Sequence, residues 1–287
     1  MSVARTGALP NSYKFYTIAV NRFENRKLEG LVFHESREEA VVFKSLTQMA
    51  SVLNSMFDES HYPMKSVDQR CFRRKQTEDW EEEAAFTTMD IPGTACGELA
   101  TFRLHVKYRY HATWQGNIAH RESGTVYPFE SFMELMRIFD RVLGQPCDAL
   151  DPLGKKMCEV AVCNYQNSTF VGEVSHPAVK DRFFFENEFQ LLDHLELMLG
   201  ERPADVQDDS VITPRQGSVC RGTIGPMTFL VRVLFRRNNT WQGTVCWKKK
   251  GEQASFRSFL ELLIMVDSAV RRADFQKESE PAGEVTA

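Results

Sequence analysis

The sequence predicts an α+β protein made of four β-β-β-α units, arranged as two tandem domains whose antiparallel sheets each carry helices on one face. Three observations support this fold class. The string Thr-Trp-Gln-Gly occurs twice, at residues 113–116 and 240–243, and one weaker copy of its surroundings precedes each occurrence. In every copy the hydrophobic pattern changes from a period of two to a helical period. A helix-capping sequence marks the point of change.

The four copies share one spacing, which starts at a glycine. An apolar residue follows two positions later, and phenylalanine follows after thirteen. Serine or asparagine comes two residues further on, and glutamate or glutamine three residues after that. The four sets are Gly30, Phe43, Ser45 and Gln48; Gly116, Phe129, Ser131 and Glu134; Gly172, Phe185, Asn187 and Gln190; and Gly243, Phe256, Ser258 and Glu261. Repetition on a fixed spacing indicates a repeated structural unit.

Each unit begins with strands. Residues 102–109 and 229–236 show the period of two that is typical of half-buried strands, with Phe235 on the predicted buried face. The dipeptides at 111–112 and 238–239 lie where a hairpin turn must reverse the chain. Thr-Trp-Gln-Gly then opens the second strand, and a short third strand leads into the helix.

A capping box predicts where each helix starts. The side chains of such a pair, for example Ser131 with Glu134 or Ser258 with Glu261, satisfy N–H groups that have no partner within the helix. Apolar residues then recur at helical spacing, so each helix has one face suited to cover a sheet.

The units pair into two domains, because only the second and the fourth carry the full string. The predicted ranges are 12–143 for the first domain, with units at about 13–59 and 99–143, and 152–272 for the second, with units at about 156–200 and 227–272. A segment rich in Pro and Gly links them. Residues 70–86 are predicted to form an excursion loop or an extra strand, and the polar residues 273–287 a disordered tail.

The repeated string is interpreted as scaffold. Trp114 and Gly116 share one strand face, as do Trp241 and Gly243, and that face also carries the apolar residue of each unit. Tryptophan then fills the core, and glycine leaves room for a close approach of backbone or ring. The alternative is a surface platform on which a base or a peptide stacks.

Basic residues form the candidate binding surface. One strand face carries Arg103, His105, Lys107 and Arg109, and the last unit carries Arg232, Arg236, Arg237, Lys248, Lys249 and Lys250. A sheet with helices on one side leaves its other face free, and a basic face can hold phosphates. Alternatively these side chains are solvated, or are neutralised by acidic residues such as the run at 78–83.

Composition excludes several classes of protein. Net charge is only −4, and 43% of the residues are hydrophobic, as in soluble globular proteins. The seven cysteines include no Cys-x-x-Cys pair, and His34, His120 and His176 occupy the position of Trp247, which favours packing over metal binding. No phosphate-loop, dinucleotide or hydrolase motif occurs. We therefore expect no enzyme activity, no cofactor and no metal, in a reduced cytoplasmic protein without membrane spans.

The two complete units resemble a family of uncharacterised bacterial proteins that share a module of the form F-R-x-H-V, A/N-T-W-Q-G and F-R-S-F-L-E-L. The segments that carry the likeness are "ATFRLHVKYRYHATWQG" with "YPFESFMEL", and "MTFLVRVLFRRNNTWQG" with "SFRSFLELL". This resemblance implies a bacterial, cytoplasmic setting and no particular ligand. In topology alone, paired strand-rich units that each end in one helix look like the PUR and Whirly group of single-strand nucleic-acid-binding proteins.

Two hypotheses for the function follow. The first is a non-catalytic binding or adaptor protein, either of an unknown protein partner or of its own copies. The second is a single-stranded nucleic-acid-binding protein that uses the basic sheet faces.

Overall fold

The computed structural model describes residues 11–68, 70, 72, 86–90, 95–144, 152–167, 169–176, 178–200 and 227–279. The first half contains the short helix η1 (Asn11–Lys14), β1 (Tyr16–Glu24), β2 (Lys27–Phe33), β3 (Glu39–Phe43), α1 (Leu46–Glu59), β4 (Thr88–Asp90), β5 (Ala100–Tyr108), β6 (Gln115–His120), β7 (Thr125–Phe129) and α2 (Phe132–Leu143). The second half contains β8 (Met157–Gln166), β9 (Thr169–His176), β10 (Val179–Phe185), α3 (Glu188–Leu199), β11 (Thr228–Arg237), β12 (Thr240–Trp247), β13 (Glu252–Phe256) and α4 (Phe259–Ser279).

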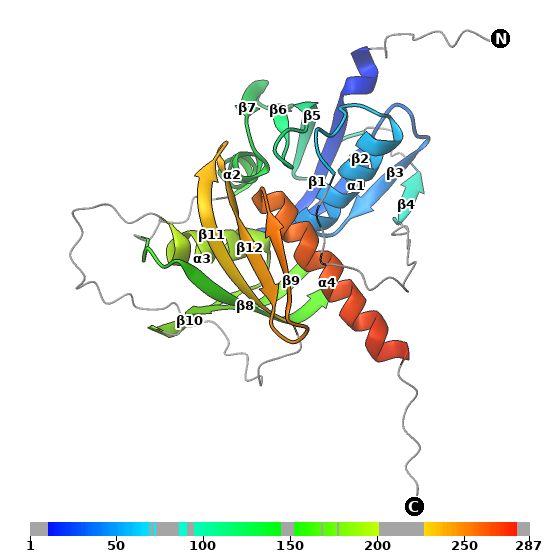
Figure 1. Ribbon diagram of the computed structural model, residues 1–287. Helices are drawn as coiled ribbons and strands as arrows, with labels where there is room; N and C mark the ends of the chain where they lie inside the picture. Colours follow the sequence, from blue (N-terminus) through cyan, green and yellow to red (C-terminus); the bar gives the residue numbers. More distant parts are fainter. Residues whose placement is uncertain are drawn as a thin grey trace, which may run out of the picture.

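The strands form two antiparallel sheets, one in each half (Figure 1). Their strand orders are β4-β3-β2-β1-β5-β6-β7 and β10-β9-β8-β11-β12-β13. In both sheets the two units meet through their first strands, β1 with β5 and β8 with β11. Each sheet is therefore two three-stranded units joined side by side, and the first sheet gains β4 at its edge. The predicted α+β fold class is confirmed.

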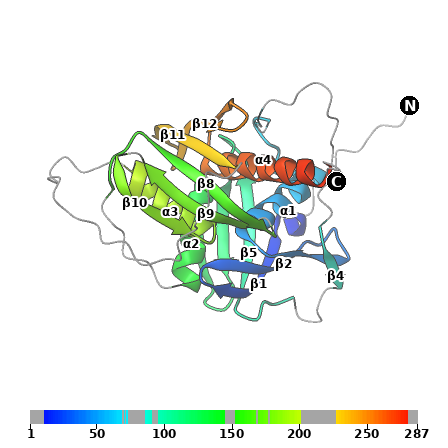
Figure 2. The same ribbon diagram turned by 90° about the horizontal axis from the view of Figure 1, so that it is seen from below.

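The four long helices lie between the two sheets (Figure 2). Helix α1 packs on β2 and β3 of its own sheet and also against α4 and β9 of the other half. Helix α2 likewise contacts α4. Buried residues of both halves belong to one continuous hydrophobic cluster, so the two halves share a core.

All four capping boxes are present. Ser45, Ser131, Asn187 and Ser258 each accept a hydrogen bond from the main-chain N–H three residues later, at 3.0–3.1 Å. Two of these caps also contact the opposite half of the protein. Ser258 donates to the carbonyl oxygen of Ala112 at 2.6 Å, and Asn187 to that of Asn25 at 2.7 Å. Since Ala112 and Asn25 lie in hairpin turns, the caps that start the helices also join the halves.

Threonine and tryptophan of the repeated string hold the helix onto its sheet. Thr113 accepts a hydrogen bond from the N–H of Phe132, the first residue of α2, at 2.8 Å, and Thr240 does the same for α4. The tryptophans are buried, with 1% exposure for Trp114 and 5% for Trp241. Each packs its ring edge-on against the phenylalanine that begins its helix.

Glutamine and glycine of the string shape the hairpin. Gln115 hydrogen-bonds both main-chain groups of Tyr110, and Gln242 does the same for Arg237. A Cβ on Gly116 would lie 2.0 Å from the main-chain oxygen of His105, so no side chain fits there. Every residue of the string thus makes a contact within the fold, as its interpretation as scaffold requires.

Each of the four repeat glycines pairs with a strand that contains a β-bulge. Val20, Val106, Val162 and Val233 pair with the repeat glycines, and the register shifts immediately after each valine. The extra residue reverses the alternation of side chains in the rest of the strand. As a result Phe235, predicted to be buried, is 54% exposed, and Arg109, predicted on the open face, is 6% exposed.

The C-terminal helix is longer than the sequence indicates. Helix α4 continues to Ser279, whereas the sequence predicts a disordered tail from residue 273. Two ion pairs hold the helix just before this extension: Arg271 pairs with Asp267 one turn earlier, and Arg272 pairs with Glu252 of β13. Residues 280–287 and most of the segment 70–86, including the acidic run at 78–83, lie outside the described residues.

Candidate functional site

Basic and aromatic side chains meet on the outer face of the first sheet, opposite its helices. Their sources are η1 and the residue that follows it, the loop after α1, and strand β5 with its hairpin end. We call this surface the basic–aromatic face; it consists of Lys14, Phe15, Tyr62, Arg103, His105, Lys107, Tyr108 and Tyr110.

The centre of the face is a set of ring and cation contacts. The guanidinium group of Arg103 lies 4.0 Å from the ring centroid of Phe15, and the ring of His105 lies 4.8 Å from the same ring. The hydroxyl of Tyr62 is 3.5 Å from Nε2 of His105. The Lys14 ammonium lies 5.8 Å from the centroid of the Tyr62 ring. Segments far apart in the sequence therefore build one surface.

Tyr108 and Tyr110 form the exposed end of the face. Their rings stack with centroids 5.2 Å apart and planes 13° from parallel. The two side chains are 51% and 48% exposed, so much of each ring faces solvent. The bulge after Val106 explains this position, because it places Tyr108 opposite Gln115 on the outer side of the sheet.

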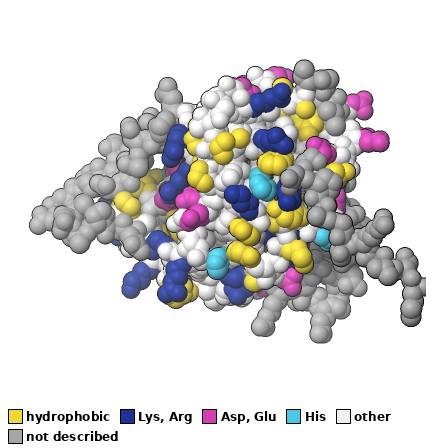
Figure 3. All heavy atoms as spheres, turned by 90° about the horizontal axis from the view of Figure 1, so that it is seen from above, with side chains coloured by type: hydrophobic (Ala, Val, Ile, Leu, Met, Phe, Trp, Pro, Cys, Tyr) yellow, Lys and Arg dark blue, Asp and Glu magenta, His cyan; other side chains and the backbone are white. Residues whose placement is uncertain are grey.

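Two cations of this face, Arg103 and Lys107, have no acidic partner in the described part of the chain. Burial lowers the pKa of His105, and the cations Lys107, Lys14 and Arg103 lower it further. The residues paired with Arg103 and His105 across the sheet are uncharged: Thr17, Ala119 and Asn117. Within the described ranges no carboxylate pairs with Arg103 or Lys107. Figure 3 shows Lys and Arg side chains interspersed with hydrophobic ones on the surface seen from above.

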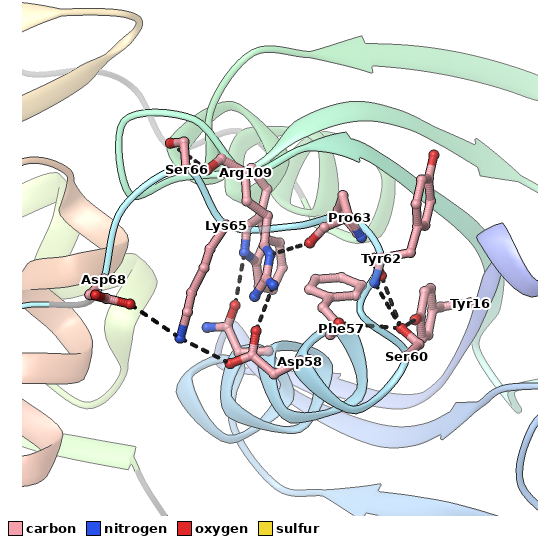
Figure 4. A network of polar contacts seen from close by, with 12 residues as sticks. Tyr16, Phe57, Asp58, Ser60, Tyr62, Pro63, Lys65, Ser66, Asp68 and Arg109 are labelled. Atoms are coloured by element: carbon pink, nitrogen blue, oxygen red, sulfur yellow. Dashed lines mark hydrogen bonds and ion pairs between the residues drawn. The ribbon is translucent and has the colours of Figure 1, made fainter. Parts of the chain in front are cut away.

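Arg109 does not belong to this face, contrary to the prediction. Its Nε donates to the carbonyl oxygen of Pro63 at 2.7 Å and its Nη2 to Asp58 at 2.5 Å (Figure 4). Ser66 donates to the main-chain oxygen of Arg109 at 3.1 Å. These contacts fix the loop after α1 against the end of β5, and that loop carries Tyr62. Arg109 therefore has a positioning role.

The predicted basic residues of the last unit lie on the second sheet, apart from the basic–aromatic face. Arg232 and Arg237 are exposed, and Lys249 is exposed in the turn between β12 and β13. Arg236 instead donates to the main-chain oxygen of Leu199 at the end of α3. Arg236 nevertheless stays exposed, and the bulge in β11 explains its orientation.

Acidic partners neutralise part of the second sheet. Lys248 pairs with Glu159 at 2.8 Å, and Arg182 pairs with Glu173 at 2.6 Å. The Lys250 ammonium lies 4.7 Å from the ring centroid of Trp247. The Arg237 guanidinium lies 5.2 Å from the centroid of the exposed Phe235 ring, so the second sheet also has a cation beside an aromatic ring. The first sheet differs because two exposed tyrosine rings stack there beside Arg103 and Lys107.

Metal or nucleophile chemistry has little support in the described residues. His34 stacks on Tyr16 at 4.3 Å, which is a packing contact, and no group of three or more His, Cys, Asp or Glu in the described part of the chain could hold a metal ion. Cys158 lies in the core, where burial raises the pKa of its thiol, so it stays protonated.

A small cavity lies between the halves. It is lined by Asn54, Asp58, Arg109 and Trp114 of the first half and by Leu260, Glu261 and Ile264 of the second. Its volume of ≈ 60 Å³ has room for a few water molecules and is far below the roughly 300–1,000 Å³ of typical organic-ligand pockets.

Sequence reasoning missed the aromatic part of the site. Lys107-Tyr108-Arg109-Tyr110 alternates basic and aromatic residues, and that pattern could have been read as a signal. The sequence carries no such signal for Lys14, Phe15 and Tyr62, because only the fold brings η1 and the loop after α1 beside β5.

No protein-family model, curated protein or solved structure matches this chain. The resemblance to the bacterial family therefore stays a prediction. None of the described helices is both long and apolar enough to cross a membrane. Fold and site together define a two-sheet α+β protein with a basic–aromatic surface.

Proposed function

We propose that the protein is a non-catalytic binding protein that holds a nucleic-acid strand on its basic–aromatic face. The observation that carries this proposal is the combination of Arg103 and Lys107, without carboxylate partners among the described residues, with the half-exposed rings of Tyr108 and Tyr110. Cations on a sheet attract phosphates, and aromatic rings provide stacking surfaces for bases.

The shape of the site favours a polymer over a small molecule. The face is spread over β5, its hairpin end and two neighbouring segments, with side chains that stay open to solvent. Small-molecule sites are concave and enclose most of their ligand. An extended strand, in contrast, can contact several side chains along an open sheet.

Loss of two cations is expected to weaken binding and to reduce its dependence on salt. We predict that Arg103→Gln combined with Lys107→Gln weakens binding of a fluorescent 20-nucleotide strand about tenfold or more at low salt. The slope of log affinity against log salt should fall by roughly 0.7 for each phosphate contact removed. Fluorescence anisotropy over a salt series measures both quantities.

The matched control removes two charges from the other sheet. Arg232→Gln combined with Lys249→Gln changes net charge equally but leaves the basic–aromatic face intact. Equal losses in the two double variants would show that only overall charge matters. Undetectable binding by the unmodified protein at low salt would end the proposal.

Association with a protein partner or a second copy is the second candidate. Exposure of Leu234 and Phe235 beside the bulge of β11 favours it, since exposed apolar side chains are typical of interaction surfaces. Sedimentation at several concentrations distinguishes the two candidates. A concentration-dependent mass that Phe235→Ser abolishes supports self-association.

A further inference from the structure

The tyrosines of the basic–aromatic face indicate what kind of strand it takes. Tyr62, Tyr108 and Tyr110, which we call the tyrosine cluster, lie where the loop after α1 passes the end of β5. Burial raises the pKa of Tyr62, and the nearby Tyr108 raises it further. Arg109 fixes the loop that carries Tyr62, so the cluster is held in place before any ligand arrives.

We propose that the tyrosine cluster is a base-stacking subsite, and that the ligand is therefore single-stranded. This inference rests on the proposed function. In a duplex each base stacks on its neighbours within the helix, so an aromatic side chain reaches a base face there only by separating stacked bases, which costs a few kcal/mol. An unpaired nucleotide offers its base face without that cost. The half-exposed rings of Tyr108 and Tyr110 offer such a partner.

Charges beside the cluster are placed for the backbone of the same strand. Arg103 and Lys107 lie on β5, in the same strand segment that ends at Tyr108. A nucleotide stacked on the cluster can therefore direct its phosphates along β5 towards these cations. Aromatic rings stack on every type of base, so the subsite should prefer single strands without preferring any base sequence.

The repeat provides an internal comparison. Phe235 occupies in β11 the position that Tyr108 occupies in β5: each lies just past the bulge and pairs with the glutamine of the repeated string. Its neighbour Leu234 takes the place of Lys107, and Arg237 that of Tyr110. The second sheet thus has the same backbone without the cluster, and the subsite belongs to the first half.

The test compares three polyanions and three variants by fluorescence anisotropy. A labelled 20-nucleotide single strand, the same sequence as a duplex, and heparin as a competitor without bases are the probes. We expect the single strand to bind at least about tenfold more tightly than the duplex. Tyr108→Ala combined with Tyr110→Ala should weaken single-strand binding roughly 5- to 150-fold, and should leave the salt slope unchanged because no cation is lost.

Conservative and matched variants separate stacking from folding. Tyr108→Phe combined with Tyr110→Phe keeps both rings and should retain affinity. Phe235→Ala, the equivalent change in the second sheet, should also bind normally. All these side chains are substantially exposed, so the melting temperatures should agree. A double phenylalanine variant as weak as the double alanine variant would refute stacking, and an equal loss in Phe235→Ala would refute the location.

The two proposals fail in different ways. If duplex and heparin bind as tightly as the single strand and the alanine variant is unaffected, the stacking subsite is wrong while polyanion binding stands. If no polyanion binds at low salt, the proposed function falls and the subsite with it.

Discussion

Gly243→Val is expected to destabilise the protein by about 3 kcal/mol or more, and to leave part of it unfolded at physiological temperature. A Cβ at this position would lie 1.9 Å from the main-chain oxygen of Arg232 and 2.9 Å from the ring of Phe256. The carbonyl belongs to the strand just before its bulge, so it cannot move without breaking the sheet pairing. Urea unfolding followed by circular dichroism measures the loss.

Its control is the next residue of the strand. Thr244→Val introduces the same side chain on the outer face, where Thr244 pairs with Arg232 and Ser255, and should change stability little. Gly116→Val should behave like Gly243→Val because the clash with His105 is equivalent. Unchanged stability with lost ligand binding would instead make the repeated string part of a binding site.

Glu188→Gln is expected to be more stable than the unmodified protein at pH 8, and this advantage should be much smaller at pH 5. Glu188 is fully buried at the start of α3, and burial raises the pKa of its carboxyl to about 7. In the native state its side chain accepts a hydrogen bond from Thr47 of α1, while Asp267 raises the pKa further and Lys27 lowers it. The pH-sensitive carboxylate therefore lies where the halves meet.

The direction follows from the two protonation equilibria. Unfolded Glu188 ionises near pH 4.5 and folded Glu188 near 7, so the native state holds the extra proton between these values. This contribution to stability is complete below pH 4.5 and is lost as pH rises to 7. Since each pKa unit corresponds to about 1.4 kcal/mol, the advantage of the glutamine variant should grow by about 3 kcal/mol across that range.

Urea unfolding at several pH values checks this prediction. Glu186→Gln, an exposed carboxylate two residues before Glu188, is the control variant. A stability difference between Glu188→Gln and the unmodified protein that does not change with pH would contradict it.

The fold could be predicted largely from local signals. Capping boxes, turn dipeptides and the repeated glycine spacing act within one unit, and all of them recur in the structure at the expected residues. Packing of the helices between two sheets could not be predicted, because amphipathic helices can cover either one sheet or two. Helix α4 continues to Ser279, although the polar composition after residue 272 predicts a disordered tail.

The site was predicted in part. Arg103, His105 and Lys107 precede or form the bulge and lie on the expected face, whereas Arg109 and Arg236 lie beyond it and turn away. Simple alternation cannot reveal a bulge. The repeat glycine is its only sequence signal, since it marks where a partner carbonyl approaches too closely for a side chain. The glycine predicts a bulge only when the strand that pairs with it is known, and the sequence alone does not identify that strand.

Photocrosslinking tests the central claim most directly. A single strand that carries 5-iodouracil, irradiated in complex with the unmodified protein, should attach to aromatic side chains that its bases contact. Peptide mass spectrometry is expected to locate the crosslinks at Tyr108 or Tyr110, with Tyr62 as a further position. Crosslinks confined to the second sheet, for example at Phe235, or none above the level seen with excess unlabelled strand, would contradict it.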